Sequence, residues 1–181
     1  MSPNRVELMP HDPAWVPRAL AEAASLRGVL GDVLLVVHHI GSTAISGIHA
    51  KPVIDLMPVV RTLPALEVFR EGLQALGYEW CGEFGLTGRR YCRKDDPVTG
   101  KRVFQLHAYA EGDNGVLRHL AFRDYLRKYP AVATDYDIVK TRCQRQHPED
   151  SHAYSACKAD WIGDIEARAL QSLATASTTT E

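Results

Sequence analysis

The 181-residue sequence lacks a long apolar run, an excess of either charge and any leader-like N-terminal segment. No stretch approaches the roughly 20 apolar residues that span a bilayer, and no basic segment precedes an apolar one at the N-terminus. With 21 basic and 22 acidic residues the net charge is -1, which argues against a nucleic-acid-binding or membrane-binding protein. We therefore expect a cytoplasmic protein.

Paired cysteine motifs are also missing. Four cysteines are scattered along the chain without a CxxC pair: Cys81, Cys92, Cys143 and Cys157. This spacing favours reduced thiols that serve in packing over a disulfide framework or a structural zinc site.

What the chain does contain is enough apolar residues, 45% of the total, to bury one sizeable core. We expect one domain over residues 1–174 and a frayed Ser/Thr/Ala-rich tail at 175–181. Runs rich in β-branched residues predict strands at 33–37, 52–60, 78–80, 89–94 and 102–109, with the last two forming a hairpin. Helices are expected at 62–76, 114–128, 130–146 and 150–173.

A further helix is expected before the first strand, with Asp12 and Pro13 at its start. Its apolar stripe is predicted to contain Val16, Leu20, Ala23, Ala24 and Leu30. The central strands and the helical C-terminal third together predict an α+β fold.

A Gly-Ser-Thr turn and an aspartate lie on either side of the connection between the first two strands. Gly41 permits close backbone approach to a ligand, and the hydroxyls of Ser42 and Thr43 suit phosphate oxygens. Asp55 lies in an apolar strand, where an ionised carboxylate needs compensation. It either faces a ligand or is held by a structural partner, and the preceding turn favours a ligand.

Alternation in the last strand places His107 on one face with Val103, Gln105 and Tyr109. If this strand neighbours that of Asp55, the two side chains face each other. They could then bind a divalent metal, Mg²⁺ or Mn²⁺, or His107 could act as an acid or base. A structural histidine is the alternative.

Basic residues interrupt apolar or aromatic surroundings in the helical third, at Arg123, Lys140 and Lys158. Each taken singly is better explained by pairing with an acid, such as Asp124 for Arg123, or by a lysine reaching solvent. As a set they indicate phosphate binding. Arg89 and the adjacent Arg90 should point to opposite faces of the sheet, so at most one reaches His107.

Several segments together resemble the GrpB family, which is bacterial, has a nucleotidyltransferase-like fold and also occurs attached to dephospho-coenzyme A kinase. The segments are His39-Ile-Gly-Ser-Thr-Ala44, Ala50-Lys-Pro-Val-Ile-Asp55, Leu120-Ala-Phe-Arg-Asp-Tyr-Leu-Arg127 with Tyr129-Pro130, Tyr136 with Lys140, and Tyr154 with Lys158. The resemblance implies a central mixed sheet packed with helices. It also favours Arg89 over Arg90 and adds Lys51 to the phosphate-binding candidates.

In the wider superfamily, a Gly-Ser turn contacts nucleotide phosphates, and an Asp-x-Asp or Asp-x-Glu pair with a third carboxylate holds divalent metals. This sequence has Met57 where the second carboxylate would lie, and methionine cannot replace that oxygen ligand. Gln105 also replaces a histidine of the family pattern, His38 a glutamate and Ser46 a proline.

The sequence thus predicts a protein that binds a nucleotide or a phosphorylated small molecule, with metal-dependent nucleotidyl transfer as the activity implied by the fold. Asp55 and His107 are the candidate catalytic and metal-binding residues. The candidate phosphate-binding residues are Gly41, Ser42, Thr43, Lys51, Arg89, Arg123, Lys140 and Lys158. The alternative is a catalytically inactive ligand-binding or protein-interaction module. RNA binding is the weakest hypothesis, and oligomeric state is not predicted.

Overall fold

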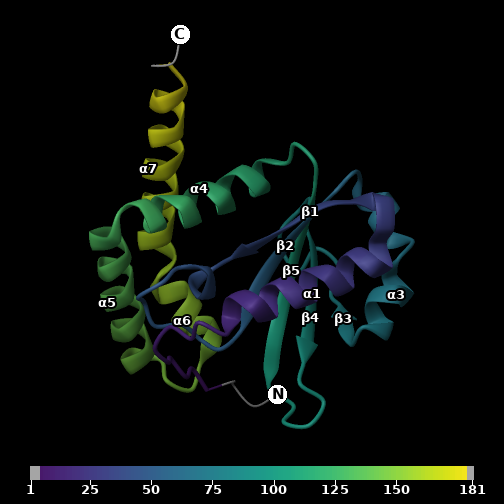
Figure 1. Ribbon diagram of the computed structural model, residues 1–181. Helices are drawn as coiled ribbons and strands as arrows, with labels where there is room; N and C mark the ends of the chain where they lie inside the picture. The colour runs from purple at the N-terminus through teal and green to yellow at the C-terminus, as the bar shows by residue number, and fades with distance from the viewer. Residues whose placement is uncertain (1–4, 179–181) are drawn as a thin grey trace. The chain divides into compact units, whose positions relative to one another are not determined.

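The computed structural model describes residues 5–178, which form two compact units (Figure 1). The sheet unit comprises residues 12–44 and 53–117, and the helical unit comprises residues 5–11, 45–52 and 118–178. The sequence predicts one domain, and the structure assigns residues 45–52, within the connection between the first two strands, to the helical unit. Within residues 5–178, no helix is long and apolar enough to cross a bilayer.

The sheet unit contains a five-stranded sheet in the order β1-β2-β5-β4-β3. Its strands are β1 (Leu34–Ile40), β2 (Ile54–Val60), β3 (Tyr78–Trp80), β4 (Arg90–Asp95) and β5 (Arg102–Ala110). β2 and β5 are parallel, and the other neighbours are antiparallel. This mixed sheet confirms the predicted α+β fold, and β4 with β5 confirms the predicted hairpin.

Helix α1 (Trp15–Leu30) packs on the sheet face that contains Leu56 and Leu106 (Figure 1). The predicted stripe was correct at Leu30, which is buried, and wrong at Val16 and Leu20, which are exposed. The buried residues follow a different helical face: Trp15, Ala19, Glu22, Leu26 and Leu30. Periodicity alone did not separate these faces, because apolar residues lie on both.

The helix expected over 62–76 is two short helices, α2 (Leu63–Glu67) and α3 (Arg70–Ala75). Thr62 caps the first, as its hydroxyl accepts a hydrogen bond from Ala65 N at 3.2 Å. The amide of Phe69 then donates to Leu66 O at 2.9 Å, a tighter turn that ends α2.

A buried polar group ties α1 to the far edge of the sheet. The Tyr78 hydroxyl and the Lys94 ammonium both donate to Glu22 Oε1, at 2.8 and 2.9 Å. Burial, followed by the charge of Glu22, raises the pKa of Tyr78 above its ordinary value. These mutual hydrogen bonds explain how a glutamate is accommodated on the buried face of α1.

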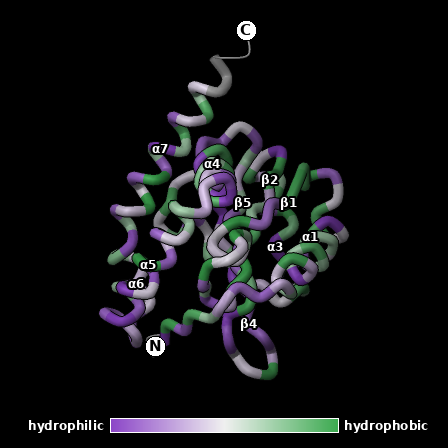
Figure 2. The backbone as a smooth tube through the Cα atoms, turned by 60° about the vertical axis from the view of Figure 1, so that its left-hand side comes forward, coloured by the Kyte–Doolittle hydropathy of each residue, from purple (hydrophilic) through white to green (hydrophobic). Residues whose placement is uncertain are grey.

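The helical unit contains most of α4 (Asn114–Lys128), and α5 (Pro130–Gln146), α6 (Ser151–Cys157) and α7 (Ala159–Thr178). The predicted bounds of α4 and α5 are confirmed. Figure 2 shows hydrophobic and hydrophilic residues alternating along α7. Its Trp161 stacks on Tyr136 of α5 with ring centroids 5.0 Å apart. Leu117, at the start of α4, is exposed.

The last predicted helix is divided between α6 and α7 at Lys158. Asp150 begins α6, because its carboxylate accepts hydrogen bonds from the amides of His152 and Ala153. Helix α7 continues through Thr178, into the tail expected to fray, and residues 179–181 lie outside the described chain.

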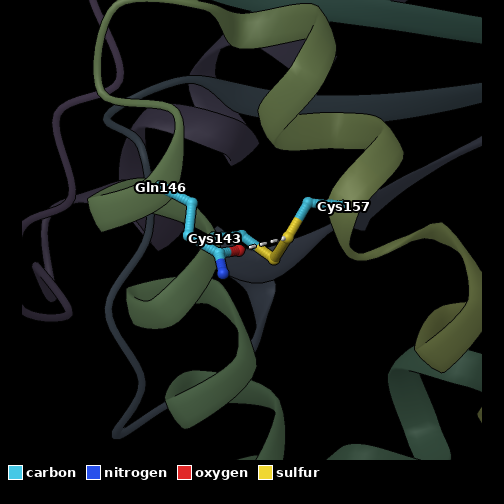
Figure 3. Close-up of a disulfide and its surroundings, with 3 residues drawn as sticks. All are labelled: Cys143, Gln146 and Cys157. Atoms are coloured by element: carbon cyan, nitrogen blue, oxygen red, sulfur yellow. Dashed lines mark hydrogen bonds between the residues drawn. A yellow bond between two sulfur atoms is a disulfide. The ribbon is translucent and has the colours of Figure 1, made fainter.

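A disulfide joins Cys143 of α5 to Cys157 at the end of α6, with Cα atoms 5.8 Å apart (Figure 3). The prediction of four reduced thiols was therefore wrong for this pair. The two cysteines are 14 residues apart and meet only because α5 and α6 pack together. Cys81 and Cys92 are free thiols, and burial raises the pKa of Cys92 to about 12.

Replacing Cys157 by serine should lower the free energy of unfolding by about 3 kcal/mol, because the disulfide closes a loop of 14 residues. Urea denaturation without reductant measures this change, with Cys81→Ser as the control that leaves the disulfide intact. Thiol titration of the denatured parent should find only Cys81 and Cys92. Four reactive thiols would contradict the disulfide.

Candidate functional site

The parallel pairing of β2 with β5 brings Asp55 and His107 together. Asp55 lies beside Gln105 in the register, so that His107, two residues further on, shares its face of the sheet. His107 Nε2 lies 3.2 Å from Asp55 Oδ1. This contact confirms the prediction that the two side chains face each other.

Arg89 determines the tautomer of His107. Its Nη1 lies 3.4 Å from His107 Nδ1, and a guanidinium can only donate. Nδ1 is therefore the acceptor, which places the imidazole proton on Nε2, where it is donated to Asp55 Oδ1. The three side chains form a directed line of hydrogen bonds that orients the Asp55 carboxylate.

The choice between the two adjacent arginines is settled by their partners. Arg90 binds Glu67 of α2 through Nε at 2.7 Å and lies 3.5 Å from Glu83. Arg89 is the one that reaches His107. It is buried, and Nη2 also donates to the carbonyl of Phe84 at 2.9 Å.

The Asp55 carboxylate restricts position 41 to glycine. Its φ of +70° is strained for other residues, and a Cβ added there would clash with Asp55 Oδ2. The small residue thus accommodates the carboxylate itself. Next to it, Ser42 begins a short 3₁₀ turn, and the buried hydroxyl of Thr43 lies 2.9 Å from His39 Nε2. Phosphate contact by these three residues stays a prediction.

The position expected for the second metal-binding carboxylate is occupied by Met57, whose side chain is 0% exposed. Among the described residues, no group of three or more His, Cys, Asp or Glu side chains could hold a metal ion. The donors therefore do not fit a two-metal arrangement. Asp55 and His107 offer one oxygen and one nitrogen, and the predicted Mg²⁺ or Mn²⁺ stays a prediction.

The helical unit has its own charged cluster, centred on Lys140 of α5, which is 1% exposed. Its ammonium donates to the carbonyl of His49, lies 3.4 Å from Asp137 Oδ1 and sits 4.8 Å from the centre of the Tyr136 ring. Desolvation by burial lowers the pKa of Lys140 to about 8, against the opposing charge of Asp137.

His49 and Asp137 were missed at the sequence level. The His49 amide donates to Asp137 Oδ1 at 2.7 Å, and its Nδ1 lies 2.8 Å from Oδ2. Burial raises the pKa of Asp137, but the hydrogen bonds from His49 and the charge of Lys140 outweigh it, so the pKa lies below its usual value. The two residues are 88 positions apart, and no local pattern could connect them.

Two further predicted lysines share one aromatic ring. Lys51 Nζ and Lys158 Nζ lie 5.6 and 4.7 Å from the centre of the Tyr154 ring. Arg123, in contrast, binds the adjacent Asp124, with Nε 2.8 Å from Oδ1, which is the pairing considered as its alternative. Of the four predicted cations in this unit, Lys51, Lys140 and Lys158 therefore contact tyrosine rings.

The predicted site residues fall into one group per unit. Gly41, Ser42, Thr43, Asp55, Arg89 and His107 belong to the sheet unit, and Lys51, Arg123, Lys140 and Lys158 to the helical unit. Their joint action on one ligand stays a prediction.

The family model described as GrpB protein matches residues 5–168. The chain belongs to the GrpB family. It is 38% identical to UPF0157 protein YqkA of Bacillus subtilis, covering 92% of this chain and 48% of YqkA. It is also 31% identical to a dephospho-CoA kinase of Mycolicibacterium paratuberculosis, over 91% of this chain and 46% of that protein. The chain thus spans about half the length of these two relatives.

The crystal structure of conserved protein GrpB from Enterococcus faecalis matches with a TM-score of 0.86 and 39% identity, covering 92% of this chain and 99% of that one. A crystal structure of the Cid1 poly(U) polymerase matches with a TM-score of 0.51 and 14% identity, over 76% and 43% of the two chains. At this identity the likeness concerns the fold alone. The fold is nucleotidyltransferase-like, as the GrpB resemblance implied.

Gly41→Ala should destabilise the protein more than Gly47→Ala. Both glycines have positive φ, which costs an alanine about 1 kcal/mol, but only Gly41 has a neighbour in the way. Urea denaturation compares the variants. Adding Asp55→Ala to Gly41→Ala should recover part of the loss, because the clashing carboxylate is gone. Equal losses of unfolding free energy in Gly41→Ala and Gly47→Ala would contradict the close approach of Asp55 to Gly41.

Lys140 should make stability depend on alkaline pH. Its pKa is about 8 in the folded state and about 10.5 when unfolded, so the unfolded state binds more protons between these values. The free energy of unfolding should therefore rise with pH, by about 1.5 kcal/mol between roughly pH 7.5 and 9.5. Relative to the parent, Lys140→Met should lack this rise in urea denaturation, while the exposed-site variant Lys128→Met should retain it.

Proposed function

We propose that this protein binds a nucleotide or a similarly phosphorylated small molecule at the sheet face that contains Asp55. The observation that carries the proposal is the line from Arg89 through His107 to Asp55. Two polar side chains, Arg89 and His107, orient the Asp55 carboxylate on a sheet of nucleotidyltransferase-like fold. Such an arrangement is preorganised for a ligand group at Asp55.

The electrostatics suit a metal-bound phosphate better than a free one. A carboxylate repels phosphate in the absence of a cation, and a divalent cation between them removes the repulsion. In this proposal Asp55 contacts a cation carried by the ligand, or orients an acceptor group. The proposal uses residues of the sheet unit alone.

Met57 makes binding the better supported function and nucleotidyl transfer the second candidate. Transfer by two metals needs an oxygen ligand where this thioether is buried. The relatives named dephospho-CoA kinase are about twice as long as this chain, which suits a module that binds a nucleotide-related ligand beside another domain. Coenzyme A precursors therefore belong among the ligands to be tested.

Asp55→Asn should weaken ligand binding roughly 10- to 100-fold in Mg²⁺ or Mn²⁺, because the variant loses the charge that holds the cation. In chelator the same variant should bind phosphates as well as the parent or better, since the repulsion is relieved. Calorimetry with nucleoside triphosphates, dephospho-coenzyme A and sugar phosphates measures both conditions.

The matched control is Glu71→Gln, which removes one exposed carboxylate from α3. Its affinities should equal those of the parent. Identical affinities of the parent and Asp55→Asn for every ligand, with and without metal, would refute the proposal. Metal-dependent release of pyrophosphate by the parent, absent in Asp55→Asn, would favour the second candidate, nucleotidyl transfer.

A further inference from the structure

The connection between β3 and β4 has an unusual conformation and composition. It reads Cys81-Gly-Glu-Phe-Gly-Leu-Thr-Gly-Arg89, and its three glycines all have positive φ. Phe84 does as well, at φ 47°, and no other non-glycine residue of the described chain does so. A bulky residue in this region is strained, so the loop holds Phe84 in place at a cost in free energy.

Burial does not compensate for that cost, because Phe84 is 55% exposed. One face of its ring stacks on Tyr91, with centroids 4.9 Å apart and planes inclined by 21°. Since this contact covers one face, the exposure places the other toward solvent. The structure thus presents a flat aromatic surface outward.

The stack leads directly to the candidate site. Tyr91 is buried and lies beside His107, with ring centroids 5.4 Å apart. His107 in turn contacts Asp55. Phe84 is therefore two ring contacts away from the imidazole that orients the carboxylate.

Arg89 fixes the loop and the site to each other. It is 7% exposed, and Nη2 donates to the carbonyls of Glu83 and Phe84 at 3.2 and 2.9 Å. Its guanidinium also lies 5.1 Å from the centre of the Tyr91 ring and contacts His107. The amide of Gly88 closes the loop by donating to Glu83 Oε1 at 3.0 Å. These contacts hold the Phe84 ring, called the platform below, in one position before any ligand binds.

We propose that Phe84 is the surface on which the base of a bound nucleotide stacks. The inference rests on the proposed function and narrows its ligand class from phosphorylated compounds in general to nucleotides. Stacking on an aromatic ring is favourable for every base, because each base has a π face. The platform therefore selects for a base over a sugar and discriminates little among bases.

Calorimetry with ATP, GTP, CTP, UTP and inorganic tripolyphosphate, in Mg²⁺, tests the proposal. The parent should bind the nucleotides more tightly than tripolyphosphate. Phe84→Ala should weaken nucleotide binding by about 5- to 100-fold and leave tripolyphosphate unchanged. Phe84→Tyr and Phe84→Trp should bind nucleotides like the parent, because they keep a flat ring.

Leu86→Ala is the matched control, since Leu86 is a second exposed apolar residue of the same loop, at 46%. It should leave all affinities unchanged. The platform is refuted if Phe84→Ala binds nucleotides like the parent, or if Leu86→Ala weakens nucleotide binding as much as Phe84→Ala does. Either result would suit a loop that contacts a protein partner better. Asp55→Asn distinguishes the platform from the phosphate-binding function, because it should weaken the binding of nucleotides and of tripolyphosphate together.

If the parent binds tripolyphosphate as tightly as the nucleotides, the platform fails while the proposed phosphate-binding function stands. If the parent binds none of the probes, both fail. Thermal denaturation of Phe84→Ala should match the parent within a few degrees, because little burial is lost.

Discussion

The parallel pairing of β2 with β5 is the constraint on which the candidate site depends. Parallel neighbours keep a constant register, so residues 52 positions apart in the sequence share one face of the sheet at hydrogen-bonding distance. The hairpin partner β4 then places Tyr91 opposite His107. Without this pairing, Asp55 would be an aspartate in an apolar strand with no partner to orient it.

Close packing around that carboxylate explains several small features together. Gly41 is needed because a Cβ at this position would clash with Asp55 Oδ2. Arg89 is buried where its donors bind both His107 and the loop that contains Phe84. Met57 belongs to the same strand and is fully buried. Strand β2 therefore presents one carboxylate and no second oxygen ligand at position 57, which does not fit two-metal chemistry.

Much of the secondary structure was predictable from the sequence. The hairpin rests on turn residues and the start of α5 on Pro130, and both signals act over a few positions. The failed prediction on α1 was a choice between local alternatives. The stripe on α1 was misassigned because two of its faces contain apolar residues, and only packing on the sheet shows that Trp15 and Leu26 are buried.

The sequence by itself determined the α+β class, the Gly41 turn, the aspartate that needs compensation and the resemblance to the GrpB family. Periodicity, turn chemistry and motifs are local properties of the chain. Only the tertiary structure decided that Arg89 and not Arg90 reaches His107, that Lys140 is buried beside Asp137, and that Cys143 and Cys157 form a disulfide. Each of these depends on which elements pack together, and such contacts leave no periodic signal in the sequence.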